Sequence, residues 1–277
     1  MRPALIALGA LVAAAGLLGA GALAYYRREP AVPPGAKRIV MTGRSTMGLW
    51  FKHWRWPLLL RWKTTYRSWP FPYSTHVAGS VGLFYRPLDG PGAGEIERWG
   101  EPMAASFDSV LAAEEFDAAF FKFCFVDFDL RAGQDAGERL AAMRRTVERV
   151  RESCARRGIP LVIGNALPLG RPTADVVDLQ RRFNAWLDEF ASGNNDVRVF
   201  DFFSRLAGPD GALKPELARS ADDPHPNDRA FSALDDAFFA EVPPWVQARR
   251  GSGTGPEGVA SRAASRSPAG PRPAPRS

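Results

Sequence analysis

The chain has 277 residues, of which 45% are hydrophobic, and it carries a formal net charge of +6. This length allows a complete hydrophobic core, so one folded domain is expected. The charge does not indicate a nucleic-acid-binding domain, because residues 249–277 hold six arginines against one acidic residue, Glu257, and the rest is nearly neutral. Two cysteines, Cys124 and Cys154, are too few for a disulfide-rich scaffold, and both are expected to be buried free thiols.

A run of 21 residues at positions 4–24 contains only Ala, Leu, Ile, Val and Gly. A membrane-spanning helix needs about 20 apolar residues, whereas the apolar part of a signal peptide usually has about 7–15. Length therefore favours an uncleaved membrane anchor, although Arg2 and the Ala22-Leu23-Ala24 sequence also fit a cleaved signal. We expect a domain outside the cytoplasm, on the periplasmic or extracellular face, either anchored by this helix or secreted after its cleavage.

The rest of the chain divides by composition. After the N-terminal segment at residues 1–28, three prolines make residues 29–36 a stiff linker. A folded domain is expected at residues 37–245. Residues 246–277 are rich in Gly, Ser, Pro and Arg, and we expect them to form a disordered basic tail.

In chain order, the domain alternates predicted strands and helices. Short apolar or β-branched runs predict strands at residues 38–42, 116–125, 161–164 and 197–200, and residues 75–82 are expected to form a short strand that breaks into a glycine turn. Apolar spacing and terminal Gly or Pro residues predict helices at residues 102–114, 134–157 and 174–191, and a last helix after Asn227 that ends at about residue 240. The alternation predicts a three-layer α/β domain, in which helices cover both faces of a doubly wound, flavodoxin-like sheet of five parallel strands.

Residues 48–73 hold five of the eight tryptophans, interleaved with lysines and arginines. Such a segment could lie at a membrane surface or form one wall of an apolar substrate cleft. It could equally be a helix that packs on the sheet while its arginines reach solvent. Stacking on single-stranded nucleic acid also uses this pattern, but the nearby membrane segment makes nucleic acid an unlikely partner.

Polar residues follow the carboxyl ends of several predicted strands, and this is the edge at which such sheets bind ligands. Ser45 comes two residues after Gly43, at the end of the first strand. A serine hydroxyl becomes a good nucleophile when a base takes its proton, and a carboxylate commonly orients that base. Asp222 precedes His225 by three residues, and the adjacent Asp223 could take the same part. We interpret Ser45, His225 and Asp222 as a candidate triad, with Asp223 as the alternative acid.

With these motifs in these places, the sequence resembles the SGNH, or GDSL-like, hydrolase superfamily over about residues 37–240. That family places its serine just after the first strand of a five-stranded parallel sheet, and an Asp-x-x-His near the carboxyl end of the domain. The resemblance implies that Ser45 is the nucleophile, His225 the general base and Asp222 its orienting partner. It also implies that the amide of Gly79 binds the oxyanion together with the amide of Ser45.

The sequence departs from the family in two places. Arg44 stands where an acidic residue usually precedes the serine, and residues 122–127 replace the family's G-x-N-D block, which supplies an oxyanion asparagine. The loss of one such donor costs about a hundredfold in turnover. Lys122 or Asn165 could replace it, unless Lys122 reaches solvent and Asn165 caps a turn. Asp127 could bind substrate or hold a loop.

These features predict a serine acyl hydrolase that acts on an envelope ester, such as an acylated glycan or a lipid. The membrane is expected as a partner through the N-terminal helix. No residue pattern indicates a metal or another cofactor. Two alternatives remain open, namely a membrane-tethered binding protein without turnover and an acyltransferase that uses the same triad. The oligomeric state is not predicted.

Overall fold

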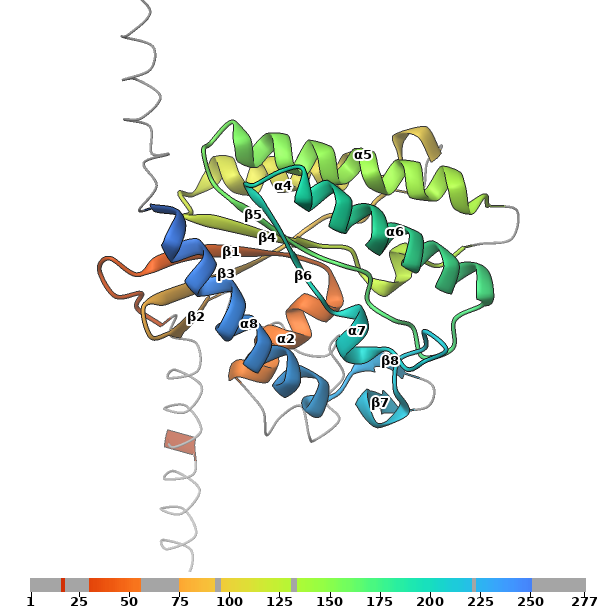
Figure 1. Cartoon of the computed structure of the whole chain (residues 1–277). Helices are drawn as coiled ribbons and strands as arrows, with labels where there is room; N and C mark the ends of the chain where they lie inside the picture. The colour runs from red at the N-terminus through yellow and green to blue at the C-terminus, as the bar shows by residue number, and fades with distance from the viewer. Residues whose placement is uncertain are drawn as a thin grey trace, which may run out of the picture.

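A computed structural model describes residues 16–17, 30–55, 75–92, 96–130, 134–220 and 223–250. Its centre is a six-stranded sheet with the strand order β2-β3-β1-β4-β5-β6 (Figure 1). Five strands are parallel, namely β3 (Val81–Pro87), β1 (Lys37–Gly43), β4 (Ala118–Lys122), β5 (Leu161–Gly164) and β6 (Val197–Phe200). The edge strand β2 (Thr75–Ala78) runs antiparallel to β3. This order is that of a doubly wound α/β sheet with one added edge strand.

Helices cover both faces of the sheet (Figure 1). One face carries α4 (Glu101–Ala113), α5 (Ala136–Ala155) and α6 (Ala174–Ser192). The other carries α2 (Ser45–Arg55), α7 (Phe203–Leu206) and α8 (Asp228–Arg250). Shorter elements lie in the connections, namely η1 (Ile96–Arg98), η2 (Phe125–Asp127), η3 (Pro215–Leu217), β7 (Ala218–Ser220) and β8 (Asp223–Pro226).

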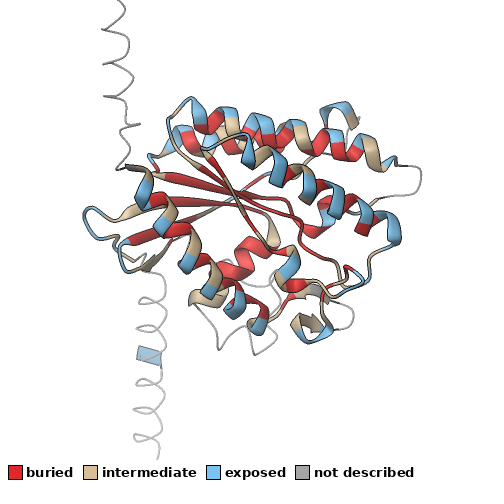
Figure 2. Cartoon of the chain, viewed as in Figure 1, coloured by how far each residue is buried: buried red, intermediate tan, exposed pale blue. Residues whose placement is uncertain are grey.

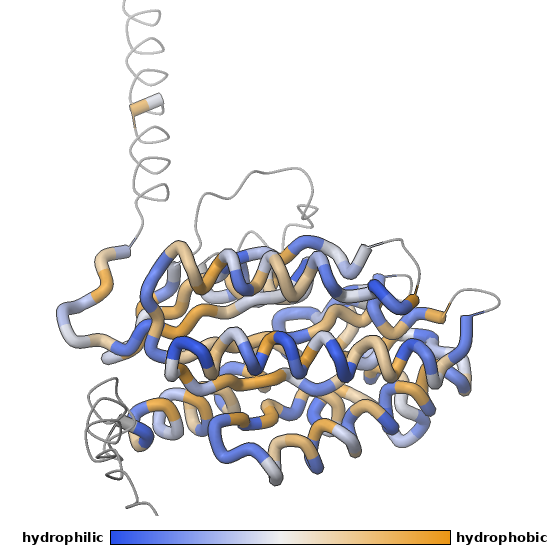
Figure 3. Tube along the Cα trace, turned by 90° about the horizontal axis from the view of Figure 1, so that it is seen from above, coloured by the Kyte–Doolittle hydropathy of each residue, from blue (hydrophilic) through white to orange (hydrophobic). Residues whose placement is uncertain are grey.

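Burial follows this layering. The central strands β1, β4 and β5 are largely buried, the edge strands β2 and β6 are partly buried, and the helices bury the sides that face the sheet (Figure 2). Along their length the helices alternate hydrophilic and hydrophobic residues, as amphipathic helices with one solvent-exposed side do (Figure 3). Both cysteines, Cys124 and Cys154, are buried free thiols, as the sequence predicts.

The predicted α/β architecture is confirmed, but the second parallel strand is β3 at Val81–Pro87, later in the chain than the strand expected within residues 75–82. The chain forms a hairpin in which β2 turns at Gly79, whose φ of 56° favours glycine, into β3. Gly82, expected in the glycine turn, lies inside β3. A Cβ atom at Gly82 would lie 2.9 Å from Cγ1 of Val32, so the glycine leaves room for the linker segment that packs on it.

The last helix is also longer than predicted. α8 ends at Arg250 rather than near residue 240, and it therefore crosses the predicted domain end at residue 245. Pro243 and Pro244 lie inside it, although proline removes helical hydrogen bonds. Val242 and Val246 are 0% and 3% exposed, and they continue the apolar side of the helix into the core. Packing thus extends the helix past its prolines.

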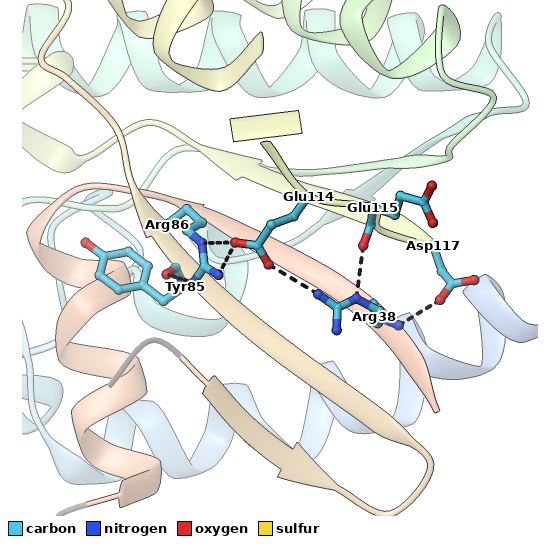
Figure 4. A network of polar contacts seen from close by, with 6 residues as sticks. All are labelled: Arg38, Tyr85, Arg86, Glu114, Glu115 and Asp117. Carbon is cyan, nitrogen blue, oxygen red and sulfur yellow. Dashed lines mark hydrogen bonds and ion pairs between the residues drawn. The ribbon is translucent and has the colours of Figure 1, made fainter. Parts of the chain in front are cut away.

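A polar network ties the central strands to the end of α4 (Figure 4). The Glu114 carboxylate accepts hydrogen bonds from Nη2 of Arg38 on β1, at 3.2 Å, and from Nε of Arg86 on β3, at 3.0 Å. The backbone N–H of Arg38 donates to Oδ2 of Asp117 at 2.8 Å. Because Glu114 and the arginines are partly exposed, these pairs fix the register of the strands more than they stabilise the fold.

Some predicted segments lie mostly or wholly outside the described residues: the N-terminal segment at 1–28, the tail beyond residue 250, and Trp56, Trp62 and Trp69. Across the described part of the chain, no helix combines the length and apolar character needed to cross a membrane.

Candidate active site

Ser45 is the first residue of α2, two residues beyond the end of β1. The connection is tight, because a Cβ atom at Gly43 would lie 3.3 Å from Cγ and O of Lys122 and from Cβ of Met47. The first amide groups of a helix have no intrahelical acceptor, and the helix dipole makes this end favourable for negative charge. The hydroxyl of Ser45 therefore lies where an anion would be stabilised.

α8 holds α2 in place through one carboxylate. Asp235 accepts hydrogen bonds from the indole N–H groups of Trp50, at 2.6 Å, and of Trp54. Its Oδ2 atom lies 3.4 Å from Nε2 of His53. Burial lowers the pKa of His53, but the carboxylates of Asp235 and Asp228 outweigh this effect and raise it above its ordinary value. Trp50 and Trp54 are thus packing residues of α2, which fits the interpretation of a helix packed on the sheet.

His225 comes from the small β7–β8 hairpin and reaches Ser45. Its Nε2 atom lies 3.3 Å from Oγ of Ser45, and its Nδ1 atom lies 2.6 Å from Oδ1 of Asp223. The rings of His225 and Phe125 pack in a T-shaped arrangement, with centroids 5.0 Å apart. The side-chain amide of Asn227 donates to the backbone oxygens of Glu216 and Ala218, and so braces the hairpin.

Asp223 is the carboxylate that the structure connects to His225. Burial opposes its ionisation, but the hydrogen bonds from the backbone and ring of His225 outweigh this effect and lower the pKa of Asp223. Its Oδ2 atom also lies 3.7 Å from Nη1 of Arg219. Asp222, the other candidate, lies outside the described residues. An ionised Asp223 is suited to holding Nδ1 of His225 protonated, which leaves Nε2 as the basic nitrogen.

The chain beyond β4 contributes Cys124, which is not among the predicted site residues. Sγ of Cys124 lies 3.5 Å from Oγ of Ser45 and 3.7 Å from Oγ1 of Thr46. The backbone N–H of Cys124 donates to Oδ2 of Asp127 at 2.7 Å, and Oδ1 of Asp127 accepts from Nη1 of Arg44 at 2.7 Å. Asp127 therefore holds the loop, which is one of its two predicted roles.

Lys122 is buried rather than solvent-exposed, with 1% of its surface accessible. Within the described residues its Nζ atom has no hydrogen-bond partner, and it lies 5.5 Å from the centroid of the Phe202 ring. Burial lowers the pKa of Lys122, against the opposing effect of Cys124 and Asp127. The amine thus lies behind the site in an apolar environment.

Two predicted oxyanion residues have other positions or roles. Gly79 lies at the amino edge of the sheet, because Lys37 pairs with Val81 there and the carboxyl end of β1 is at the other edge. Asn165 binds Oδ1 of Asp201 through its nitrogen, and its oxygen accepts from the backbone N–H groups of Phe202 and Phe203. Asn165 therefore caps the turn after β6.

The loop after β3 reaches the edge at which Gly79 was expected. The backbone N–H of Leu88 donates to the oxygen of Gly43 at 3.2 Å. A Cβ atom at Gly90 would lie 3.8 Å from the guanidinium of Arg44. Gly90 and Gly92 indicate a loop in the sequence. A correct position for β3 would have placed this loop at the carboxyl edge of the sheet, beside Ser45.

A cavity of about 700 Å³ opens at this edge. Its wall includes Trp99 and Val126, but most of its side chains are polar, among them Arg44, Asp127, Asp129, Asp135, Glu138 and Arg139. Nη1 of Arg139 donates to the backbone oxygen of Asp127, and its guanidinium lies over the ring of Trp99. No cluster of three or more His, Cys, Asp or Glu side chains that could hold a metal ion occurs among the described residues.

Neither a protein-family model nor a curated relative matches the sequence. Solved structures do match the fold. A candidate acylhydrolase from Bacteroides fragilis has a TM-score of 0.52 and 15% identity, covering 78% of this chain and 91% of its own. A GDSL-like lipase from Bacteroides thetaiotaomicron has a TM-score of 0.51 and 13% identity, covering 76% and 90%. A member of the lipolytic G-D-S-L family from Veillonella parvula has a TM-score of 0.50 and 14% identity, covering 75% and 98%. The chain therefore has an SGNH/GDSL-like fold.

Proposed function

We propose that this chain, with its SGNH/GDSL-like fold, is a serine hydrolase of carboxylic esters in which Ser45 is the nucleophile. The observation that carries the proposal is the position of His225, whose two ring nitrogens lie 3.3 Å from Oγ of Ser45 and 2.6 Å from Oδ1 of Asp223. Nucleophile, base and orienting carboxylate thus form a continuous chain of contacts. The structural likeness to lipolytic and acyl hydrolases supports the same reading of the fold.

The steps follow from these positions. Oγ of Ser45 attacks the ester carbonyl, and its proton passes to Nε2 of His225, while Asp223 stabilises the imidazolium that forms. The carbonyl oxygen becomes an oxyanion at the amino end of α2, where backbone N–H groups and the helix dipole stabilise it. His225 then protonates the leaving alcohol. Water, activated by His225, attacks the acyl-enzyme and releases the acid together with free Ser45.

The cavity lies beside the triad, because its wall includes Arg44 and Asp127 but not Ser45 or His225, and we take it as the place for the part of the substrate next to the ester. Its carboxylates, Arg44 and Arg139 offer acceptors and donors for hydroxyl groups, and Trp99 is its main aromatic wall. A lipid chain would require a largely apolar lining. We therefore favour an acylated glycan over a lipid ester, with the domain outside the cytoplasm and tethered by the N-terminal segment, as its sequence predicts.

A fluorophosphonate probe tests the proposal, because it phosphonylates a serine only where a base activates the hydroxyl. The full chain should be labelled at Ser45. Ser45→Ala and His225→Ala should prevent labelling, and Ser109→Ala, which removes an exposed hydroxyl on α4, should not. Absence of labelling in the folded protein would favour a binding protein without turnover. Faster acyl transfer from an activated ester to a sugar than to water would favour an acyltransferase.

A further inference from the structure

The Cys124 thiol is the side chain that the loop after β4 brings against the hydroxyl of Ser45. The two atoms lie 3.5 Å apart, within the range of a hydrogen bond that involves sulfur, and Cys124 is 1% exposed. The next residue, Phe125, packs its ring against His225 at 5.0 Å. One short segment therefore contacts both the proposed nucleophile and the proposed base.

The thiol is held in place from behind. The N–H of Cys124 donates to Asp127 at 2.7 Å, and the N–H of Asp127 donates to the backbone oxygen of Cys124 at 3.0 Å. Asp127 in turn accepts from Arg44, the residue before Ser45. These contacts close a ring from Ser45 through Cys124 and Asp127 to Arg44, which leaves the thiol little freedom to move away from the serine.

The surroundings of the thiol are also unusual. The amine of Lys122, the last residue of β4 and two positions before Cys124, is buried and has no hydrogen-bond partner among the described residues. A buried amine without a partner is costly, and such groups commonly persist where a reaction uses the local electrostatic potential. Cys124 and Lys122 are two positions apart where the chain leaves β4, so the thiol beside Ser45 lies next to this buried amine in the chain.

We propose that Cys124 is a positioning residue for Ser45, and that its thiol faces the oxyanion of the proposed hydrolysis. When Ser45 donates its proton to His225, the thiol donates to Oγ and fixes its direction of attack. After attack, Oγ and the oxyanion are bonded to the same carbon, so the thiol in contact with Oγ lies beside the tetrahedral intermediate. This inference rests on the proposed function, and a thiol is a weaker donor than an amide.

Substitution of the two cysteines tests the inference on the full chain with an activated ester. Cys124→Ala should lower kcat about tenfold or more, with KM unchanged within about twofold, because the contact matters in the transition state. Cys124→Ser keeps a donor of similar size and should restore most of kcat. Cys154→Ala is the matched control, since it removes the other buried thiol, which lies on α5 and outside the site. A kcat for Cys124→Ala equal to that of the wild type would overturn the inference.

The rate of fluorophosphonate labelling separates the two proposals. If the wild type is labelled at Ser45 and Cys124→Ala is labelled equally fast, the hydrolase proposal stands and the role of Cys124 is wrong. If the folded wild type is not labelled at all, the proposed function itself is wrong.

Discussion

The Nε2 atom of His225 lies 3.3 Å from the hydroxyl oxygen of Ser45, although 180 positions separate the two residues in the chain. Ser45 is positioned by the β1–α2 connection, and His225 by the β7–β8 hairpin, which is separate from the main sheet. Their contact therefore depends on the whole fold, and substitutions in the β1–α2 connection or in the β7–β8 hairpin should alter it.

The first prediction concerns the acid of the triad. Asp223→Ala should lower kcat by about 10³ to 10⁴, as expected when a base loses the carboxylate that sets its tautomer. Asp222→Ala is the matched control, one position away, and should change kcat by less than about fivefold. Steady-state kinetics on an activated ester measure both variants. A larger loss of kcat in Asp222→Ala than in Asp223→Ala would show that Asp222 orients His225.

The second prediction concerns the buried amine. Lys122→Met replaces it with an apolar side chain of similar length, so the free energy of unfolding at neutral pH should rise by about 1 kcal/mol or more. Because burial lowers the pKa of Lys122, the unfolded chain binds more protons, and wild-type stability should increase as pH rises towards the ordinary value of 10.5. The advantage of Lys122→Met should shrink over the same range.

Urea unfolding at pH 7 and pH 9.5 measures this difference. Lys37→Met is the control, because Lys37 is paired with Asp117 at 3.3 Å and its removal should bring no gain. A Lys122→Met variant less stable than the wild type would show that the amine has a stabilising partner.

The third prediction concerns the ion pair between Arg44 and Asp127. Arg44→Met leaves a carboxylate that is 1% exposed without its cation, and should cost about 3 kcal/mol of unfolding free energy. The double variant Arg44→Met, Asp127→Asn should recover part of this loss, since the amide oxygen can still accept from Cys124. Asp129→Asn, at an exposed carboxylate of the same cavity, is the control. Additive losses in the double-mutant cycle would contradict the coupling.

The fourth prediction concerns the pH dependence of the contact between α2 and α8. The folded-state pKa of His53 is raised above its ordinary value of 6.5, so its contribution to stability is complete below that value and disappears as pH rises through the raised pKa. Asp235→Asn should reduce this pH dependence and also weaken the acceptor of the Trp50 and Trp54 indoles. Thermal unfolding from pH 5 to pH 9 measures it, with the exposed Asp236→Asn on the same helix as the control. A pH slope unchanged by Asp235→Asn would be inconsistent with this origin.

Much of the site could be predicted from local sequence. Ser45 follows a glycine at the end of a β-branched strand, and His225 follows two aspartates in a proline-braced segment, and both patterns are readable over a few residues. The structure brings these two residues together as predicted, and it connects His225 to Asp223. The choice between the two aspartates depends on the β7–β8 hairpin. Its strands have three and four residues, which is too short for a recognisable strand pattern in the sequence.

Other parts depend on contacts between distant segments. Cys124 was predicted as a buried thiol, which is correct, but its contact with Ser45 spans 79 positions and depends on how the chain leaves β4. Gly79 was assigned to the wrong edge because Gly82 resembled a turn residue. Gly82 is required by its contact with Val32, 50 residues earlier, and such a contact leaves no local pattern.

The packing of Val32 on Gly82 also sets the direction from which the chain enters the domain. The linker meets the sheet at the amino ends of β1 and β3, where the N–H of Lys37 donates to the oxygen of Ser80, and the cavity lies at the opposite edge. The chain therefore enters the domain at one edge of the sheet and the cavity opens at the other. Whatever precedes residue 30 joins the domain on the side away from the cavity, so a group bound in the cavity is separated from that junction by the length of the central strands.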